Sequence, residues 1–375
     1  MSETPEPGPF GPRVTLFDHA RRLHRQHPDS PLPQDGRPYP DEDLERQRPE
    51  PDPPDDRRHA GMAAAAVLDA HFVRDGAPPS ELAGAFREVD VPIHRNDHIA
   101  AAALRAERER VRRTGRWLVR HAADRRGALV GLALLASDQA PDDIPLIRTI
   151  ALLSDTFGPL AADALRRRTR DGGDEALLWL ADRVAGWGRV YVVEALCPLA
   201  HRTAVRGWLL RRTCDGDDVL QGYYAGEAAE AAHLHEAIGA EDADDELIDQ
   251  SGQLLGTMTQ CRGQGLTLDR YPSARLALDG YARHLGRQRP ILSRYIAAVT
   301  IAGYLTDRTT NEWVSCSAGQ REELAGRILA VVDREEWCEV VRASLDPQNG
   351  YHRWLAETVG RKLRLRAFAG FGTAG

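Results

Sequence analysis

One run of ten residues, Gly127-Ala-Leu-Val-Gly-Leu-Ala-Leu-Leu-Ala136, contains no polar side chain. A helix that crosses a membrane needs about 20 apolar residues, so this run is too short to span a bilayer. A short helix without a polar face is typical of a helix that is buried on all sides. The run therefore predicts the centre of a folded core.

Apolar stripes at helical spacing follow this run. A polar turn holds Asp142 and Asp143, which we expect to cap a helix with Pro145 in its first turn. Each later stripe has apolar residues three and four positions apart, as on one face of an α-helix. The stripes are Leu146, Ile150, Leu153 and Phe157, then Leu160, Ala161, Ala164 and Leu165, then Leu177, Leu180, Ala181 and Val184. We expect short stacked helices, with Leu160 and Trp187 packed at the junctions between them.

Two segments echo each other at the length of one helix-turn-helix unit. Residues 157–165 begin with Phe-Gly and end with Asp-Ala-Leu, and residues 187–196 begin with Trp-Gly and end with Glu-Ala-Leu. Together with the helix pairs, this resembles HEAT-type α-helical repeat proteins over residues 97–212, and elsewhere in helix pattern only. The resemblance implies an all-α fold, an irregular HEAT-like α-solenoid of stacked antiparallel helix pairs. An irregular helical bundle is the structural alternative.

Proline is concentrated at the start of the chain. Residues 1–56 hold 13 of the 23 prolines, so we predict a mostly disordered segment with a short helix near 15–27. We expect the apolar face of that helix to dock onto the chain's own helices as an end cap, and the alternative is a tethered recognition helix for a partner. Residues 57–366 are predicted to form one helical-repeat domain, and residues 367–375 a flexible tail.

Composition narrows the class of protein. All basic residues but Lys362 are arginine, which we attribute first to a GC-rich bacterial genome. The net charge of -7 argues against a general nucleic-acid coat. The five cysteines form no Cys-x-x-Cys pair, and neither a phosphate-binding Gly-rich motif nor a Gly-x-Ser-x-Gly elbow occurs. The sequence also has no secretory signal or membrane-spanning run, so we expect a cytoplasmic protein without a membrane partner.

One histidine pair has the spacing of metal ligands. On a continuous helix His94 and His98 would lie one turn apart, with Asp97 in reach. The run His94-Arg-Asn-Asp97-His98 resembles the inverted zincin signature His-x-x-Glu-His, with Asp in place of the general-base Glu. That resemblance implies a metal-dependent hydrolase, whose third ligand is not identifiable among His59, His71 and His121. The alternative is a polar helix start whose histidines contact neighbouring carboxylates or carbonyls.

A second histidine cluster is found further along the chain. His233 and Glu236 would share a helix face, whereas His235 would point elsewhere. We interpret the cluster as a partly exposed helix face, and the alternative is a ligand pocket. We therefore expect no metal and no cofactor.

The strongest local charge lies at Arg105–Arg126, with nine arginines, three acids and an interleaved Trp117. One interpretation is a phosphate-tracking surface with Trp117 available for stacking. The other is that these arginines pair with acids on neighbouring helices, which the acidic net charge favours. The residues that would contact a partner are Arg112, Arg113, Arg116, Trp117 and Arg120.

No catalytic constellation emerges from the sequence. We therefore predict a non-catalytic helical-repeat scaffold or adaptor that binds another macromolecule, with a protein as the expected partner. The alternatives are a nucleic-acid-binding protein that uses Arg105–Arg126, and a metal-dependent hydrolase that uses His94, Asp97 and His98. The class of fold alone does not choose among them.

Overall fold

The computed structural model describes residues 14–48, 59–215, 219–307 and 313–371, and over these ranges the regular structure is helical with no strand. The chain divides into two compact units, Met1–Leu196 and Cys197–Gly375. The predicted all-α fold is confirmed, and the helical-repeat domain expected over 57–366 stays a prediction that spans parts of both units. No helix in the described ranges has the length and apolar character of a membrane span.

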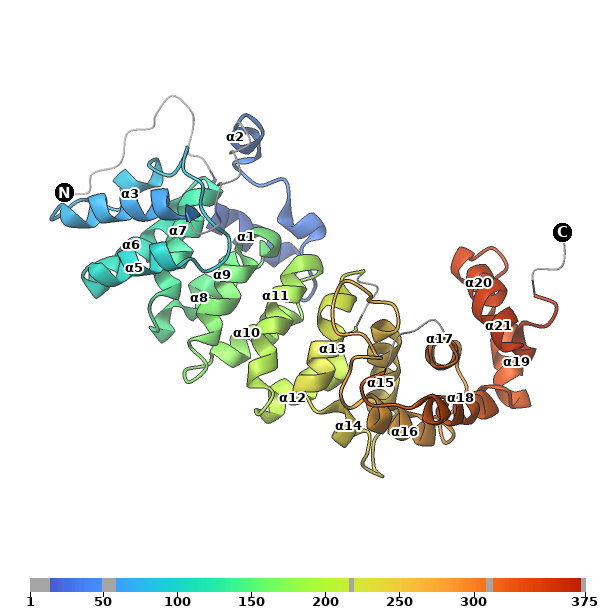
Figure 1. Ribbon diagram of the computed structural model, residues 1–375. Coiled ribbons are helices and arrows are strands. Elements are labelled where there is room, and N and C mark those ends of the chain that lie inside the picture. Colours follow the sequence, from blue (N-terminus) through green and yellow to red (C-terminus); the bar gives the residue numbers. More distant parts are fainter. Residues whose placement is uncertain (1–13, 49–58, 216–218, 308–312, 372–375) are drawn as a thin grey trace. The chain divides into compact units, whose positions relative to one another are not determined.

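The first unit is built from two layers of helices (Figure 1). One layer contains α5, α7, α9 and α11, with each helix packed on the next, and the other contains α6, α8 and α10. Consecutive helices from the two layers form antiparallel pairs. The bounds are α3 Met62–Val73, α4 Ser80–Ala83, α5 Asp97–Arg105, α6 Arg108–His121, α7 Arg125–Ala136, α8 Ile144–Ile150, α9 Ser154–Arg166, α10 Gly173–Ala181 and α11 Gly186–Leu196.

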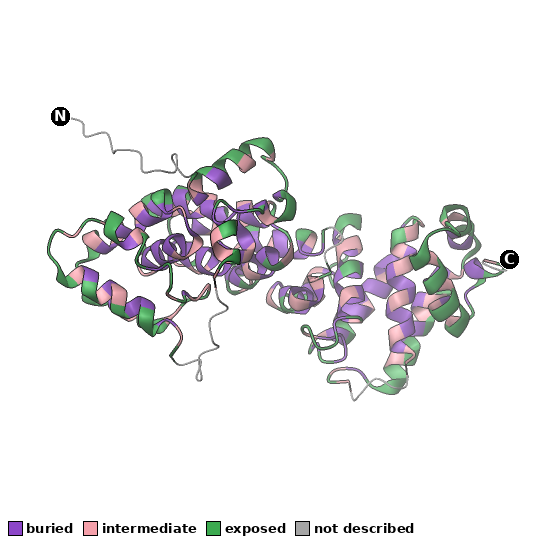
Figure 2. Ribbon diagram, turned by 90° about the horizontal axis from the view of Figure 1, so that it is seen from above, coloured by how far each residue is buried: buried purple, intermediate pink, exposed green. Residues whose placement is uncertain are grey.

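The apolar run lies at the centre of this unit. Every residue from Gly127 to Ala136 in α7 is buried, as predicted. The backbones of α6 and α7 approach so closely that a Cβ atom at Gly131 would lie 2.7 Å from the Leu118 Cβ atom and 3.0 Å from the Gly115 carbonyl oxygen. Only glycine permits this approach, so Gly131 sets the spacing of the pair. Figure 2 shows buried positions where helices face one another and exposed positions on the outer surfaces.

Two packing predictions in this unit have different outcomes. Leu160 is 1% exposed, which confirms that it belongs to the core. Trp187 is 42% exposed, so its predicted place at a packed junction is wrong. Trp187 lies in the first turn of α11, and its ring stacks on Tyr191 with centroids 6.1 Å apart.

The N-terminal segment is more ordered than its composition suggests. The predicted helix is present as α1, Leu16–Gln26, and it docks onto the chain's own helices as expected, but on α6 and α8 within the layer and not at an end of the stack. Residues 27–48 continue over the unit with a 3₁₀ turn at Pro33–Gly36 and α2 at Glu42–Arg46. The expected disorder is therefore wrong for residues 14–48, because polar side chains in this segment bind the ends of other helices. Residues 1–13 and 49–56 of the predicted segment lie outside the described ranges.

The second unit is also layered. Helices α13, α15 and α17 pack in succession as one layer, and α14, α16 and α18 pack as the other. Figure 1 shows the layers in yellow to red. The bounds are α12 Thr203–Arg212, α13 Gln221–Ala231, α14 Leu234–Ala237, α15 Asp245–Met258, α16 Ala274–Leu285, α17 Leu292–Leu305, α18 Ala318–Val332, α19 Glu335–Ser344, α20 Gly350–Leu355 and α21 Arg361–Leu363.

The expected flexible tail at 367–375 is wrong for its first residues. Phe368 is buried, and its ring packs edge-on against Tyr295 with centroids 5.9 Å apart. A Cβ atom at Gly360 would meet this ring at 2.8 Å, so the glycine makes room for it. Burial of an aromatic side chain favours order up to that point. Residues 372–375 lie outside the described ranges.

Candidate functional site

The predicted metal residues do not form the helical pair that their spacing suggests. Helix α5 begins at Asp97 and is capped by Asn96, whose side chain accepts hydrogen bonds from the backbone N–H groups of His98 and Ile99. His94 therefore precedes the helix, and its ring packs against Tyr191 with centroids 5.6 Å apart. Since an i,i+4 ligand pair requires both residues on one helix, the geometric basis of this prediction is wrong.

The suggested third ligands give no support to that site. His59 and His121 are exposed, and His121 lies beside Trp117 with ring centroids 5.0 Å apart. His71 is buried, and desolvation, followed by the charges of Arg110 and Arg74, lowers the pKa of its imidazole. Over the described ranges, none of these residues joins His94, Asp97 or His98 in a group of three close metal donors.

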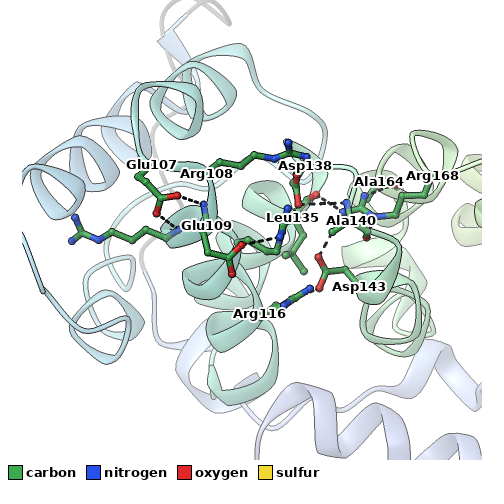
Figure 3. Close-up of polar contacts among 12 residues, drawn as sticks. Glu107, Arg108, Glu109, Arg116, Leu135, Asp138, Ala140, Asp143, Ala164 and Arg168 are labelled. Atoms are coloured by element: carbon green, nitrogen blue, oxygen red, sulfur yellow. Dashed lines mark hydrogen bonds and ion pairs between the residues drawn. The ribbon is translucent and has the colours of Figure 1, made fainter. Parts of the chain in front are cut away.

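The arginine-rich helix α6 is anchored by two acids from the turn after α7. Arg112 Nε lies 2.6 Å from Asp138 Oδ2, Arg108 Nη2 lies 2.6 Å from Asp138 Oδ1, and Arg116 pairs with Asp143. Burial disfavours the charged form of Asp138, but the hydrogen bonds from Arg112 and Arg108 outweigh it and hold the pKa of that carboxyl well below its usual range. Figure 3 shows this cluster.

Asp143 also approaches a fully buried positive charge. Arg168 is 0% exposed and its Nη2 lies 4.0 Å from Asp143 Oδ2. Its guanidinium donates to the carbonyl oxygens of Leu135, Ala140 and Ala164 at 2.8–2.9 Å (Figure 3). Leu135 and Ala164 belong to the last turns of α7 and α9, whose carbonyls have no partner within their own helices. Arg168 thus joins two helix ends, and Asp143 does not cap α8 with its side chain as predicted.

The remaining arginines of the basic stretch are mostly paired. Arg105 binds Asp69, Arg125 binds Asp41 and Glu42, Arg126 binds Glu45, and Arg110 donates to three backbone carbonyls. Arg113 and Arg120 are exposed, and Trp117 is half-buried. Of the predicted partner contacts, Arg112 and Arg116 therefore belong to the ion network inside the unit. The expected pairing of these two with acids is confirmed.

A groove in the second unit offers a different kind of site. It has a volume of about 600 Å³ and lies between α13, α15 and α17, with Tyr351 of α20 at its edge. Its described lining carries no charged side chain and consists of amides, hydroxyls, glycines and small apolar groups. The lining residues are Val219, Gln221, Gly222, Gly252, Gln253, Gly256, Thr257, Gln260, Cys261, Gln264, Ser293, Ile296, Ala297, Thr300 and Tyr351.

Helix α15 forms the floor of this groove. Gly252 and Gly256 lie one turn apart on α15, Gln253 and Thr257 line the groove beside them, and Gln260 lines it from the turn after the helix. A Cβ atom at Gly256 would meet nothing within 4 Å, so this glycine faces open space. Gln253 and Gln260 are exposed, and each side-chain amide carries donors and an acceptor. The floor can therefore hydrogen-bond a neutral ligand without an ionic partner.

An exposed aromatic pair stands at the edge of the groove. Tyr351 and Trp354 on α20 stack with centroids 5.7 Å apart at 27°, and they are 43% and 47% exposed. Asn349 caps this helix by accepting hydrogen bonds from the backbone N–H groups of Tyr351 and His352. Desolvation raises the pKa of Tyr351, so its hydroxyl stays neutral at physiological pH. The pair offers a rigid apolar face with a polar edge.

The sequence contained a signal for this groove that the prediction did not use. Small and polar residues at 252, 253, 256 and 257 interrupt the apolar pattern of α15 on one face, and Gln260 follows just after the helix. Burial also raises the pKa of the Cys261 thiol in the lining, so a reactive thiolate is disfavoured there.

Comparisons with models of protein families, with curated proteins and with solved structures found no match. The HEAT-like resemblance stays a prediction.

Proposed function

We propose that this protein is a non-catalytic helical scaffold whose second unit binds an extended segment of a partner protein in the α13–α15–α17 groove. The observation that carries the proposal is the uncharged groove floor, with Gln253 and Gln260 exposed beside the open space at Gly256. A peptide backbone in extended conformation presents unpaired N–H and C=O groups, and side-chain amides can satisfy both kinds.

The aromatic pair supports a preference within that class of ligand. Tyr351 and Trp354 present exposed ring surface beside the groove. Proline-containing segments in polyproline II conformation dock on grooves with aromatic residues, because their rings pack on aromatic faces and little conformational entropy is lost. We therefore propose a neutral, extended, proline-containing segment as the ligand.

A cytoplasmic place of action remains part of the proposal. Cys261, Cys316 and Cys338 are buried free thiols. Thiols that persist unpaired are usual in a reducing compartment.

The test uses labelled decapeptides of zero net charge, with proline, alanine or tyrosine varied in a constant Ser/Gln background, and fluorescence anisotropy with the full chain. Gly256→Leu should fill the groove and lower the affinity for the best-binding peptide by about tenfold or more, which corresponds to about 1.4 kcal/mol of binding free energy. The matched control is Gly326→Leu on α18, where a Cβ atom also meets nothing within 4 Å and the residue is exposed. Equal loss in both variants, or no saturable binding of any peptide, would contradict the proposal.

Salt dependence separates this function from nucleic-acid binding. An uncharged groove should bind its peptide equally at low and high salt, whereas contacts with phosphates weaken steeply as salt rises. The nucleic-acid alternative has lost support, since seven of the nine arginines in 105–126 have partners within the unit. A groove ligand whose affinity falls steeply with salt would favour that alternative over the peptide.

A further inference from the structure

Three potential metal ligands lie close together just after α13, at the end of this helix that is remote from the groove. His233, His235 and Glu236 each place a potential ligand atom within 4.8 Å of the others. Over the ranges that the structure describes, this is the one group of three histidine, cysteine or carboxylate donors with such close spacing. None of the three lines the groove in the same unit.

The backbone at His233 creates this arrangement. Helix α13 ends at Ala231, and His233 adopts φ 52 and ψ 54 before α14 starts at Leu234. On a continuous helix, residues two apart point to nearly opposite sides, so the prediction that His235 points away followed from an unbroken helix. The left-handed residue overturns it, because the two imidazole centroids lie 6.1 Å apart. A non-glycine residue in this conformation is strained, and such residues are found preferentially at functional sites.

The carboxylate of Glu236 is already oriented. Its Oε2 lies 3.3 Å from Arg206 Nη2 on α12, and its Oε1 lies 3.8 Å from His233 Nδ1. One oxygen is thus held by a neighbouring helix while the other faces the imidazole, as in sites where an outer residue orients a ligand. His235 adds an unused nitrogen, since its Nδ1 is shielded from solvent and has no hydrogen-bond partner within the described residues. Buried ring nitrogens normally have a partner.

We propose that His233, His235 and Glu236 bind one Zn²⁺ ion. Two imidazoles and a carboxylate suit Zn²⁺, which takes nitrogen and oxygen ligands in a tetrahedral arrangement, whereas Mg²⁺ and Ca²⁺ prefer oxygen ligands alone. Three protein ligands leave the fourth position for water or for a donor from another molecule. His233 and Glu236 are each 58% exposed at the side chain, so the ion can enter without unfolding of the unit. This site does not depend on peptide binding in the groove.

The experiment titrates the untagged, chelator-treated full chain with ZnCl₂ in a calorimeter and measures bound zinc after gel filtration. We expect one equivalent of zinc, a rise in melting temperature on its addition, and no binding of Mg²⁺ at the same concentrations. The double variant His233→Ala/His235→Ala should lose the bound zinc and the rise in melting temperature. Glu236→Gln, which keeps the size of the side chain, should weaken binding by about tenfold or more.

The matched control is the double variant His94→Ala/His98→Ala, which removes two exposed histidines in the other unit. It should bind zinc like the unaltered chain. Far-ultraviolet circular dichroism of each variant shows that the helices are intact, and Glu236→Gln provides the readout if the double alanine variant does not fold. The proposal is overturned if the chain binds no stoichiometric zinc, if Glu236→Gln binds as tightly as the unaltered chain, or if zinc is lost in the control instead.

Discussion

Asp35 accepts hydrogen bonds from the backbone N–H group and hydroxyl of Ser154, each at 2.6 Å, although the two residues are 119 positions apart. The other carboxylate oxygen accepts from the backbone N–H of Asp155 at 2.9 Å. Helix α9 therefore receives its N-terminal cap from the segment before α2, and no side chain in its own flanking sequence supplies one. This contact explains why a polar, proline-rich segment is ordered: it satisfies donors that the core helices leave unpaired.

The first prediction follows from this cap. Asp35→Ala should destabilise the first unit by about 0.5–2 kcal/mol, the usual effect of removing an N-cap side chain. The matched control is Asp43→Ala on α2, whose carboxylate is exposed and pairs only with Arg46 in the described ranges. Thermal melting followed by circular dichroism compares the two variants. Equal midpoints for Asp35→Ala and the unaltered chain would show that the cap adds no stability.

A second prediction concerns Arg168. Arg168→Met should destabilise the unit by about 3–5 kcal/mol, because the buried carboxylate of Asp143 loses a counter-charge and three carbonyls each lose one donor. Arg166→Met is the control, since Arg166 forms a partly exposed pair with Asp163 on the same helix. That change should cost about 0–1 kcal/mol. Urea denaturation of both variants measures the difference, and similar midpoints would argue against a special role for Arg168.

The third prediction is a pH dependence. The pKa of Asp138 is lowered in the folded chain, so its ionised form contributes stability at all pH values above the pKa of the unfolded chain, near the ordinary value of 3.8. That contribution is lost as the pH falls from there toward the lower folded pKa. Asp138→Asn should therefore be less stable than the unaltered chain by about 1–3 kcal/mol at neutral pH. The difference should shrink below about pH 4. Denaturation at pH 7 and pH 3 measures it, and a constant difference would contradict the assignment.

The fourth prediction addresses the basic helix. Replacing Arg112, Arg113 and Arg116 with alanine should lower the melting temperature, because two of these side chains bind Asp138 and Asp143. Any weak retention of nucleic acid should stay unchanged. The control replaces only the exposed Arg113 and Arg120, which should leave the melting temperature unaltered. Gel-shift titrations at two salt concentrations complete the test. Tight, salt-sensitive binding that disappears in the control variant would revive the phosphate-tracking interpretation.

Local pattern predicted much of the fold. The buried helix at Gly127–Ala136 and the helix near 15–27 could be recognised because apolar periodicity acts over a few neighbouring residues. The predictions failed where the structure depends on contacts between segments that are distant in sequence. The order of residues 14–48 depends on pairs such as Asp35 with Ser154 and Asp41 with Arg125. The residues near Asp35 in sequence do not include its partner Ser154, so a local pattern cannot predict this contact.

The candidate sites failed for a related reason. His94 and His98 have the right spacing, but Asn96 starts the helix between them. His233 and His235 have the wrong spacing for a helix, but a left-handed residue brings them together. Both outcomes depend on the backbone conformation of one residue, which apolar periodicity does not report. The groove was not predicted because most of its residues are small or carry amides, and such residues indicate no site when they are read one helix at a time. They form a site only because three helices bring them onto one surface.

The long-range pairing of residues 14–48 has a consequence for the order in which the chain matures. Contacts that join segments far apart in sequence slow folding, because a long loop must close before they form. During synthesis this segment emerges before its partners Arg125 and Ser154. We therefore expect it to stay unfolded and accessible to proteases until α9 has left the ribosome. The layers of the second unit join helices that are near neighbours in sequence, so we expect these layers to form as the chain emerges. Limited proteolysis of nascent chains stalled before and after residue 166 would reveal the moment at which the first unit closes.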